Sequence, residues 1–218
     1  FIMLSHYKAR YILDYSLFLQ LFRDCYSFVS SRLDNDSSTH SFEHTLRVID
    51  LCYSIGVKLH AFIDVCLLSA LFHDVSRPEE SKTGACHAEL GSRIAFDFLS
   101  ERGFPDLAEE VRLNILEHRF SKSRDPTSIE GKILQDADML DALGSIGLFR
   151  VISFSLEHNR DIDEMLLHFD EKLFLLPSRM HFRFTKKLAK RRLKILKKFY
   201  SQIKAETSFS ITQELVDN

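Results

Sequence analysis

The apolar residues of this chain recur three and four positions apart, and this spacing constrains the fold more than any other feature of the sequence. In residues 11–29 the spacing gives one broad stripe, formed by Ile12, Tyr15, Phe18, Leu19, Phe22, Tyr26 and Val29. No run alternates polar and apolar residues for long enough to require a β-sheet. The sequence therefore predicts an all-α protein.

The same spacing predicts helices along most of the 218 residues. We expect them at about 11–29, 42–55, 62–75, 87–102, 105–119, 128–143, 146–158, 162–173 and 179–204. Residues 77–85, RPEESKTGA, have the composition of a loop. Because no repeat or long linker divides the chain, we expect a single domain. An N-terminal helix (1–36) would pack on a core (37–178), and a basic helix (179–218) would complete the same domain.

Composition excludes several classes of protein. With 45% hydrophobic and 28% charged residues the chain is typical of a globular domain, and no apolar run approaches the ~20 residues of a membrane span. The four cysteines, at 25, 52, 66 and 86, show no CxxC or disulfide-scaffold spacing, which favours a reducing cytoplasm. The opening residues FIMLSHYKAR lack the pattern of a signal peptide, so we expect none.

Charge is distributed unevenly along the chain. From residue 179 onward there are 11 Lys or Arg and 3 Asp or Glu, a net charge of +8, whereas the overall charge is -2. We expect an amphipathic terminal helix that docks through Leu188, Ile195, Leu196 and Phe199. The charges, spread over its other face, would attract anionic substrates at long range. Because few aromatic residues accompany them, we do not expect nucleic acid as a partner.

The first candidate functional residues are His73 and Asp74, near the end of the apolar run LLSALFHDV. Burial of an imidazole together with a carboxylate costs several kcal/mol unless a partner compensates it. That partner is either a metal ion or a network of hydrogen bonds. His44 lies among apolar residues of the preceding helix and offers a second imidazole.

Three further carboxylates lie in the otherwise apolar segment ILQDADMLDAL, at Asp136, Asp138 and Asp141. Neighbouring carboxylates repel one another and resist burial unless a cation, either a metal or an Arg or Lys, stabilises them. The density of apolar residues around them argues against all three facing water.

The order His44, His73-Asp74, Asp138 resembles the HD-domain superfamily of metal-dependent phosphohydrolases, in particular its small, stand-alone bacterial members. Flanking segments agree in order with that branch: HTLRV from His44, Arg77-Pro78, Cys86-His87-Ala-Glu89, Glu117-His118-Arg119-Phe120, DADMLDALG from Asp136, and His168 to Lys172 before the basic helix. The resemblance covers roughly residues 37–200. It implies a single HD-type helical domain.

The resemblance also implies that His44, His73, Asp74 and Asp138 ligate one divalent metal per chain. Two imidazoles and two carboxylates suit Mn²⁺, Fe²⁺, Co²⁺, Ni²⁺ or Zn²⁺ better than Mg²⁺. Such a metal activates water and polarises a phosphoryl group. A free oxygen of Asp74 or Asp138 would accept the proton of that water.

Two more histidines, His87 and His118, have two alternative roles. As cations they would bind the substrate phosphate or protonate the leaving group, which is the role we favour. Alternatively they would hold a second metal bridged through Asp74, as in two-metal HD relatives. Each is also compatible with a purely structural place at a helix end.

Cationic residues near these motifs complete an expected phosphate site. The main candidates are Arg47, Arg77, Lys82 and Lys172, with Arg119 and Arg150 as weaker ones. Residues 77–85, as a loop, would gate the substrate.

The leading hypothesis is a metal-dependent phosphohydrolase that acts on a small phosphorylated substrate, most plausibly a nucleotide, at a phosphoester or pyrophosphate bond. The alternative is a non-catalytic, metal-stabilised helical module that binds nucleotide or nucleic acid through its basic C-terminal helix. We expect no membrane partner. The sequence is compatible with both a monomer and a homodimer. A purely structural helical domain would require the four proposed ligands to lie apart in space.

Overall fold

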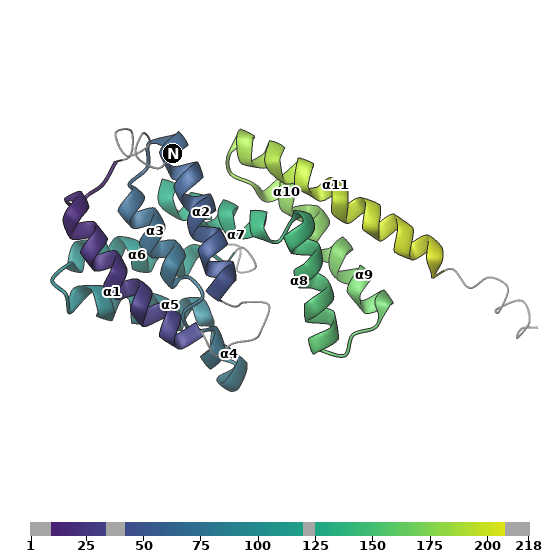
Figure 1. The fold of residues 1–218 in the computed structure, drawn as a ribbon, viewed down its shortest axis with the longest axis horizontal. Helices are drawn as coiled ribbons and strands as arrows, with labels where there is room; N and C mark the ends of the chain where they lie inside the picture. Colours follow the sequence, from purple (N-terminus) through teal and green to yellow (C-terminus); the bar gives the residue numbers. More distant parts are fainter. Residues whose placement is uncertain (1–9, 34–41, 120–124, 208–218) are drawn as a thin grey trace, which may run out of the picture. The chain divides into compact units, whose positions relative to one another are not determined.

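The computed structural model describes residues 10–33, 42–119 and 125–207, and helices dominate these ranges (Figure 1). Within them, β pairing is limited to one isolated bridge between Arg10 and Phe62. In chain order the elements are α1 (Tyr15–Leu33), α2 (Phe42–Leu59), α3 (Ile63–Phe72), α4 (Arg77–Thr83), α5 (His87–Ser100), α6 (Pro105–Glu117), α7 (Ile129–Asp141), α8 (Gly144–Glu157), α9 (Ile162–Glu171), η3 (Leu173–Leu175), α10 (Leu176–Arg179) and α11 (Arg183–Glu206). The predicted all-α class is confirmed.

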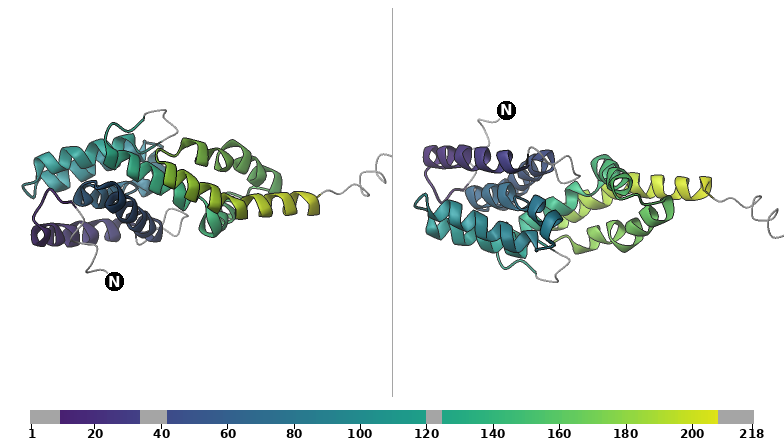
Figure 2. Two further views of the ribbon diagram at one scale, coloured as in Figure 1. Left: turned by 90° about the horizontal axis from the view of Figure 1, so that it is seen from above. Right: turned by 90° about the horizontal axis from the view of Figure 1, so that it is seen from below.

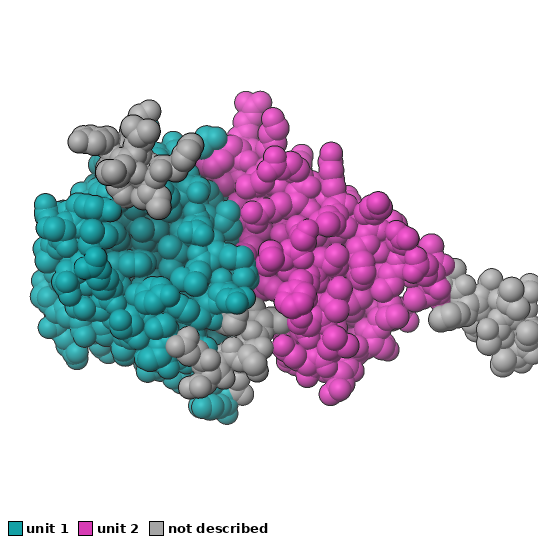
Figure 3. Space-filling view, in the orientation of Figure 1, with its two compact units in different colours: residues 1–138 teal, residues 139–218 magenta. Residues whose placement is uncertain are grey.

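The chain forms two compact units, residues 1–138 and 139–218 (Figure 3). The boundary falls inside α7, which contributes to both. The sequence predicts boundaries at residues 36 and 178 instead. Those boundaries stay a prediction. The four expected metal ligands, His44, His73, Asp74 and Asp138, all lie in the first unit.

The first unit is built around α3, which is buried on nearly every side, as its continuous apolar sequence predicts. Helix α1 packs against α3, and α5 runs beside α6 with both near α3 (Figure 2). Phe72, the last residue of α3, is fully buried and lies against Phe28 and Phe98. This packing fixes the end of α3, from which the chain passes directly into His73 and Asp74.

Residues 77–83 form helix α4, so the prediction of a loop over 77–85 was wrong. Pro78 occupies the first turn, where its missing N–H costs nothing, and Glu79 and Glu80 follow at the positive end of the helix dipole. Gly84 then ends the helix in the left-handed conformation, with φ of 72°. These start and stop signals outweigh the polar composition of the segment.

Several other helix ends differ from expectation: α1 continues to Leu33, and α2 runs through Gly56 to Leu59. Helix α1 begins at Tyr15 because Asp14 caps it, accepting a hydrogen bond from the backbone N–H of Ser16 at 2.9 Å. The last helix begins at Arg183 and not at residue 179, since Leu176–Arg179 forms the separate short helix α10.

The second unit contains α8 to α11, with α11 running beside α8 and α10 (Figures 1 and 2). The buried stripe of α11 consists of Thr185, Ala189, Leu193 and Leu196. Of the residues expected to dock this helix, Leu196 is buried but Ile195 is 42% exposed. The small side chains of Thr185 and Ala189 let the helix approach its neighbours on a face that a search for large apolar residues overlooks.

None of the four cysteines forms a disulfide, as expected, and Cys86 alone among them is partly exposed. In the part of the chain that the structure describes, no single helix has the length and hydropathy of a membrane span. Helices α7 and α8 reach that length and hydropathy only when they are taken together, and a bend of 70° separates them.

Candidate metal centre

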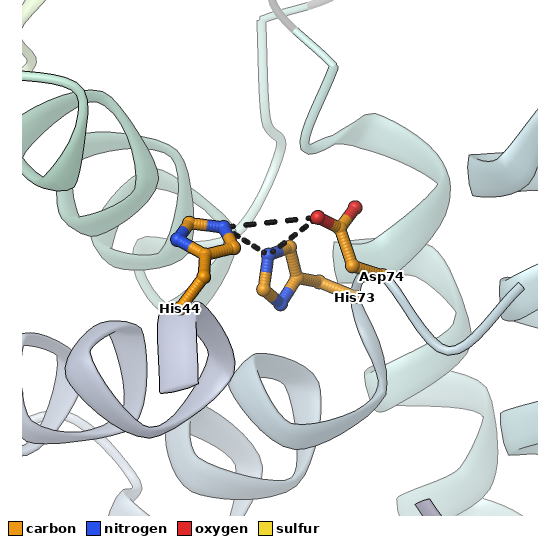
Figure 4. A group of neighbouring side chains, drawn as sticks. All are labelled: His44, His73 and Asp74. Carbon is orange, nitrogen blue, oxygen red and sulfur yellow. Dashed lines mark hydrogen bonds and ion pairs between the residues drawn. The ribbon is translucent and has the colours of Figure 1, made fainter. Parts of the chain in front are cut away.

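Three buried side chains meet where α2 and the end of α3 come together (Figure 4). His44 projects from the first turn of α2, and His73 and Asp74 follow α3 directly. The Nε2 atom of His44 lies 3.2 Å from Nε2 of His73 and 3.7 Å from Oδ2 of Asp74. The distance from His73 Nε2 to the same oxygen is 3.5 Å. We call these three residues the HHD cluster.

The tautomer of His73 is set by the backbone. Its Nδ1 lies 2.7 Å from the carbonyl oxygen of Ala70, which can only accept a hydrogen bond, so Nδ1 carries the proton. Burial lowers the pKa of His73 to about 4, despite the opposing charge of Asp74, and the ring is therefore neutral at pH 7. Its Nε2 consequently presents a bare lone pair to the cluster.

Asp138, from α7, joins the cluster through His44. Its Oδ1 lies 3.3 Å from His44 Nε2, and its side chain is 30% exposed, whereas His44 is fully buried. Burial acts to raise the pKa of Asp138, but the contact with His44 outweighs it and holds the pKa below its usual range. The four residues expected to share one ion are thus in one place, with Asp138 at the open side.

A second cluster uses the other oxygen of Asp74. Its Oδ1 lies 3.5 Å from Nε2 of His87, and that nitrogen is 3.4 Å from Nε2 of His118. His87 begins α5 and His118 follows α6, and both are buried. Asp74 therefore belongs to both clusters, one oxygen to each.

The two histidines of this second cluster are also held with Nε2 free. Nδ1 of His118 donates to the carbonyl of Ile115 at 2.6 Å, and Nδ1 of His87 donates to Oε2 of Glu80 at 2.8 Å. Burial lowers the pKa of His87 to about 4, which keeps it neutral. This makes the expected role of His87 as a cation unfavourable in the free protein, whereas a neutral donor of a lone pair fits the geometry.

The donor atoms fit a metal ion. Around His44 Nε2 lie three acceptors, the free Nε2 of His73 and one oxygen each of Asp74 and Asp138, and a single proton on His44 satisfies only one of them. Ligands at about 2.0–2.2 Å from a shared ion stand about 3–3.6 Å from one another, close to the observed separations. A divalent cation in the HHD cluster would bind these donor atoms together.

Glu80 organises the rim of the second cluster, although no sequence motif marks it. Besides His87, its Oε2 accepts from Nη1 of Arg77 at 2.7 Å, and its Oε1 accepts from Nη1 of Arg119 at 3.2 Å. Arg77 in turn donates from Nε to Oδ1 of Asp74 at 2.9 Å. The i,i+3 spacing of Arg77 and Glu80 signals this pair, but only once the segment is known to be helical.

The other expected substrate contacts are distributed as follows. Arg47 is partly buried one turn after His44 on α2, and Lys82 is exposed on α4. Lys172 is exposed at the end of α9 in the second unit. Whether these three residues contact a substrate stays a prediction.

The remaining carboxylates of α7 have other partners. Asp141 is nearly fully buried and pairs with Arg150 at 2.8 Å, so here an arginine is the cation. Arg150 therefore links α7 to α8 within the second unit, and its expected contact with a phosphate stays a prediction. Asp136 is fully buried, which agrees with the expectation that these three residues do not all face water.

Comparison with known proteins gives the same result as the geometry. Fold and site define a helical hydrolase-type domain with a His/Asp centre, and the HD domain family model matches residues 41–143. The most similar solved structures include a predicted HD superfamily hydrolase from an uncultured Thermotogales bacterium. It is 30% identical, the alignment covers 84% of this chain and 91% of that one, and the TM-score is 0.65. The chain belongs to the HD superfamily.

Two further relatives are similar to this chain over nearly their whole length. Bacillus subtilis YpgQ, described as uncharacterised, is 28% identical over 187 residues, which are 83% of this chain and 90% of that protein. Its structure in complex with ADP has a TM-score of 0.71 at 27% identity, covering 88% of this chain and 97% of that one. An HD-superfamily hydrolase from Bacillus thuringiensis is 28% identical, with a TM-score of 0.70. The alignment covers 88% of this chain and 100% of that one.

Proposed function

We propose that this protein is a metal-dependent phosphohydrolase that cleaves a phosphoester or pyrophosphate bond of a nucleotide. The observation that carries the proposal is the HHD cluster, with Asp138 at its open side and a second set of free imidazole nitrogens across Asp74. The structure of YpgQ with ADP supports a nucleotide as the substrate class, because that relative covers most of this chain.

The side chains divide the work of such a reaction. His44, His73, Asp74 and Asp138 would hold one divalent metal, which when bound supplies an activated water and charge for the phosphoryl oxygens. A carboxylate oxygen of Asp138, on the open side, would accept the proton of the attacking water. When substrate binds, the negative charge of the phosphate would favour protonation of His87 and His118 at Nε2, so that both rings donate hydrogen bonds to it, with Arg77 and Arg119 adding positive charge at the rim.

A screen for released phosphate and pyrophosphate tests this proposal. Nucleoside mono-, di- and triphosphates would be incubated with the full chain, with and without added Mn²⁺. We expect release from at least one nucleotide, dependent on the metal. Nucleotide binding without any release, with each of Mn²⁺, Fe²⁺, Co²⁺, Ni²⁺ and Zn²⁺, would instead support the non-catalytic binding module.

Replacement of His87 or His118 by alanine is expected to lower turnover by about 100-fold, the usual size of a proton-transfer or phosphate contact. Each variant should retain the metal, because the other four residues already satisfy one ion. Elemental analysis and kcat would be measured together for each variant. Two metal equivalents in the native protein, falling to one in either variant, would show that these histidines hold a second metal.

Glu80→Gln is expected to lower turnover by about 10- to 100-fold, as the loss of a carboxylate that orients a functional histidine does elsewhere. The amide keeps the size of the side chain but weakens the bonds to His87 and both arginines. The neighbouring Glu79→Gln is the matched control, because Glu79 pairs with Arg32 on α1. Equal kcat values for the two variants would contradict the positioning role of Glu80.

A further inference from the structure

A groove in the second unit is lined by four lysines of α11 and by no acidic residue. It has a volume of about 490 Å³. Its lining consists of Lys186, Lys190, Lys194 and Lys197 with Leu193 from α11, and Phe174, Pro177 and Ser178 from η3 and α10. We call it the lysine groove. All its residues belong to one compact unit, and none belongs to the HHD cluster.

The lysines form one row along the helix. Successive members are four, four and three positions apart, so they lie on the same face over about 16 Å of helix length. Lys190, Lys194 and Lys197 are exposed, and none of the four forms an ion pair with another residue in the described ranges. Lys197 instead places its Nζ 5.7 Å from the ring centre of Phe174.

This row does not stabilise the helix. Like charges at i,i+4 repel, and the only acidic residue of α11 is Glu206 at its end. The docking of α11 already depends on the apolar stripe of Thr185, Ala189, Leu193 and Leu196, of which only Leu193 also borders the groove. A bound polyanion would compensate the repulsion that the helix itself leaves in place.

The shape of the groove selects among polyanions. A compact phosphate is held by donors that converge, whereas these ammonium groups are spread along a line. A membrane surface is flat, and the apolar stripe that would insert into it is buried within the unit. An extended chain with a phosphate at every step fits a basic groove, and the partly buried ring of Phe174, which also contacts Tyr200 and Lys197, adds aromatic surface to the lining.

We propose that the lysine groove binds the phosphodiester backbone of single-stranded nucleic acid without sequence preference. The sequence alone argues against this partner, because few aromatic residues accompany the charges of the basic helix and these charges are spread over one of its faces. The fold gathers four of them in one groove together with Phe174. This binding is independent of the metal centre and does not require the proposed hydrolase activity.

Fluorescence anisotropy of a labelled 20-nucleotide oligothymidylate, titrated with the full chain in about 0.15 M salt, tests the proposal. The groove variant changes Lys186, Lys190, Lys194 and Lys197 to Gln. The control variant changes the exposed residues Arg183, Lys187, Arg191 and Lys198 to Gln, which removes the same charge outside the groove. Circular dichroism would verify that both remain helical.

We expect micromolar binding by the native chain, at least a 10-fold weaker Kd in the groove variant, and less than a 3-fold change in the control. The slope of log Kd against log salt should also fall by about 3 in the groove variant, as four lost phosphate contacts predict. Equal weakening in both variants, or no binding by the native chain at 100 µM, would overturn the proposal. Binding to phosphatidylcholine vesicles with 30% phosphatidylserine, in place of the oligonucleotide, would assign the groove to a membrane surface and likewise overturn it.

Discussion

Asp74→Ala is expected to abolish metal binding and to lower nucleotide hydrolysis by more than 100-fold, the largest catalytic effect of any single change. Asp74 alone offers an oxygen to each cluster: Oδ2 faces His44 and His73, and Oδ1 faces His87. Loss of the carboxylate therefore removes a ligand from one cluster and a partner from the other. The expected fall in activity is larger than the roughly 10- to 100-fold fall typical of a residue that only supports a metal ligand. Mn²⁺ titration calorimetry and kcat would measure the two effects.

Two companion variants make this prediction specific. Asp74→Asn keeps the shape of the side chain and should also lose the metal, because the negative charge is removed. Asp50→Ala changes an exposed carboxylate on α2 and should leave both quantities unchanged. An Asp74→Ala protein that binds Mn²⁺ as tightly as the native chain would refute the assignment of this residue.

Phe72→Ala is expected to destabilise the first unit by about 3–5 kcal/mol, the usual cost of removing a fully buried phenylalanine. Phe72 has no exposed surface and packs on Phe28 and Phe98, at centroid distances of 6.2 and 5.7 Å. Since the free energy of unfolding of such domains is about 5–15 kcal/mol, the change would remove a large part of it. Urea denaturation followed by circular dichroism would measure it.

The same deletion at Phe149 is the control. That ring is 69% exposed on α8, so Phe149→Ala should change the free energy of unfolding by less than about 0.5 kcal/mol. A Phe72→Ala effect as small as that of Phe149→Ala would mean that the end of α3 is not held by this packing.

The helices of the core could be predicted from the sequence because their burial and their periodicity have the same cause. The uninterrupted apolar residues of α3 imply burial on all sides, and burial in turn explains why His73 and Asp74 at its end need partners. Residues as distant as His44 and Asp138 could be brought to this pair only through the family resemblance, because helical spacing says nothing about which helices meet.

What the sequence did not reveal depends on tertiary contacts. The composition of α4 predicts a loop, and the bonds from Glu80 to Arg77, Arg119 and His87 follow only from its helical structure. The ion pair between Arg150 and the buried Asp141 likewise depends on how α7 and α8 meet. On α11, the face that docks is decided by small residues, and this determines which lysines line the groove.

Restoration of activity by metal is the measurement that tests the central claim most directly. The full chain would be stripped with a chelator, and hydrolysis of the best nucleotide from the screen would be followed as Mn²⁺ is added back in fractions of an equivalent. We predict no hydrolysis by the stripped protein and full recovery at about one ion per chain, as expected of a single site formed by His44, His73, Asp74 and Asp138. Hydrolysis by the stripped protein at the rate of the reloaded one would contradict the account.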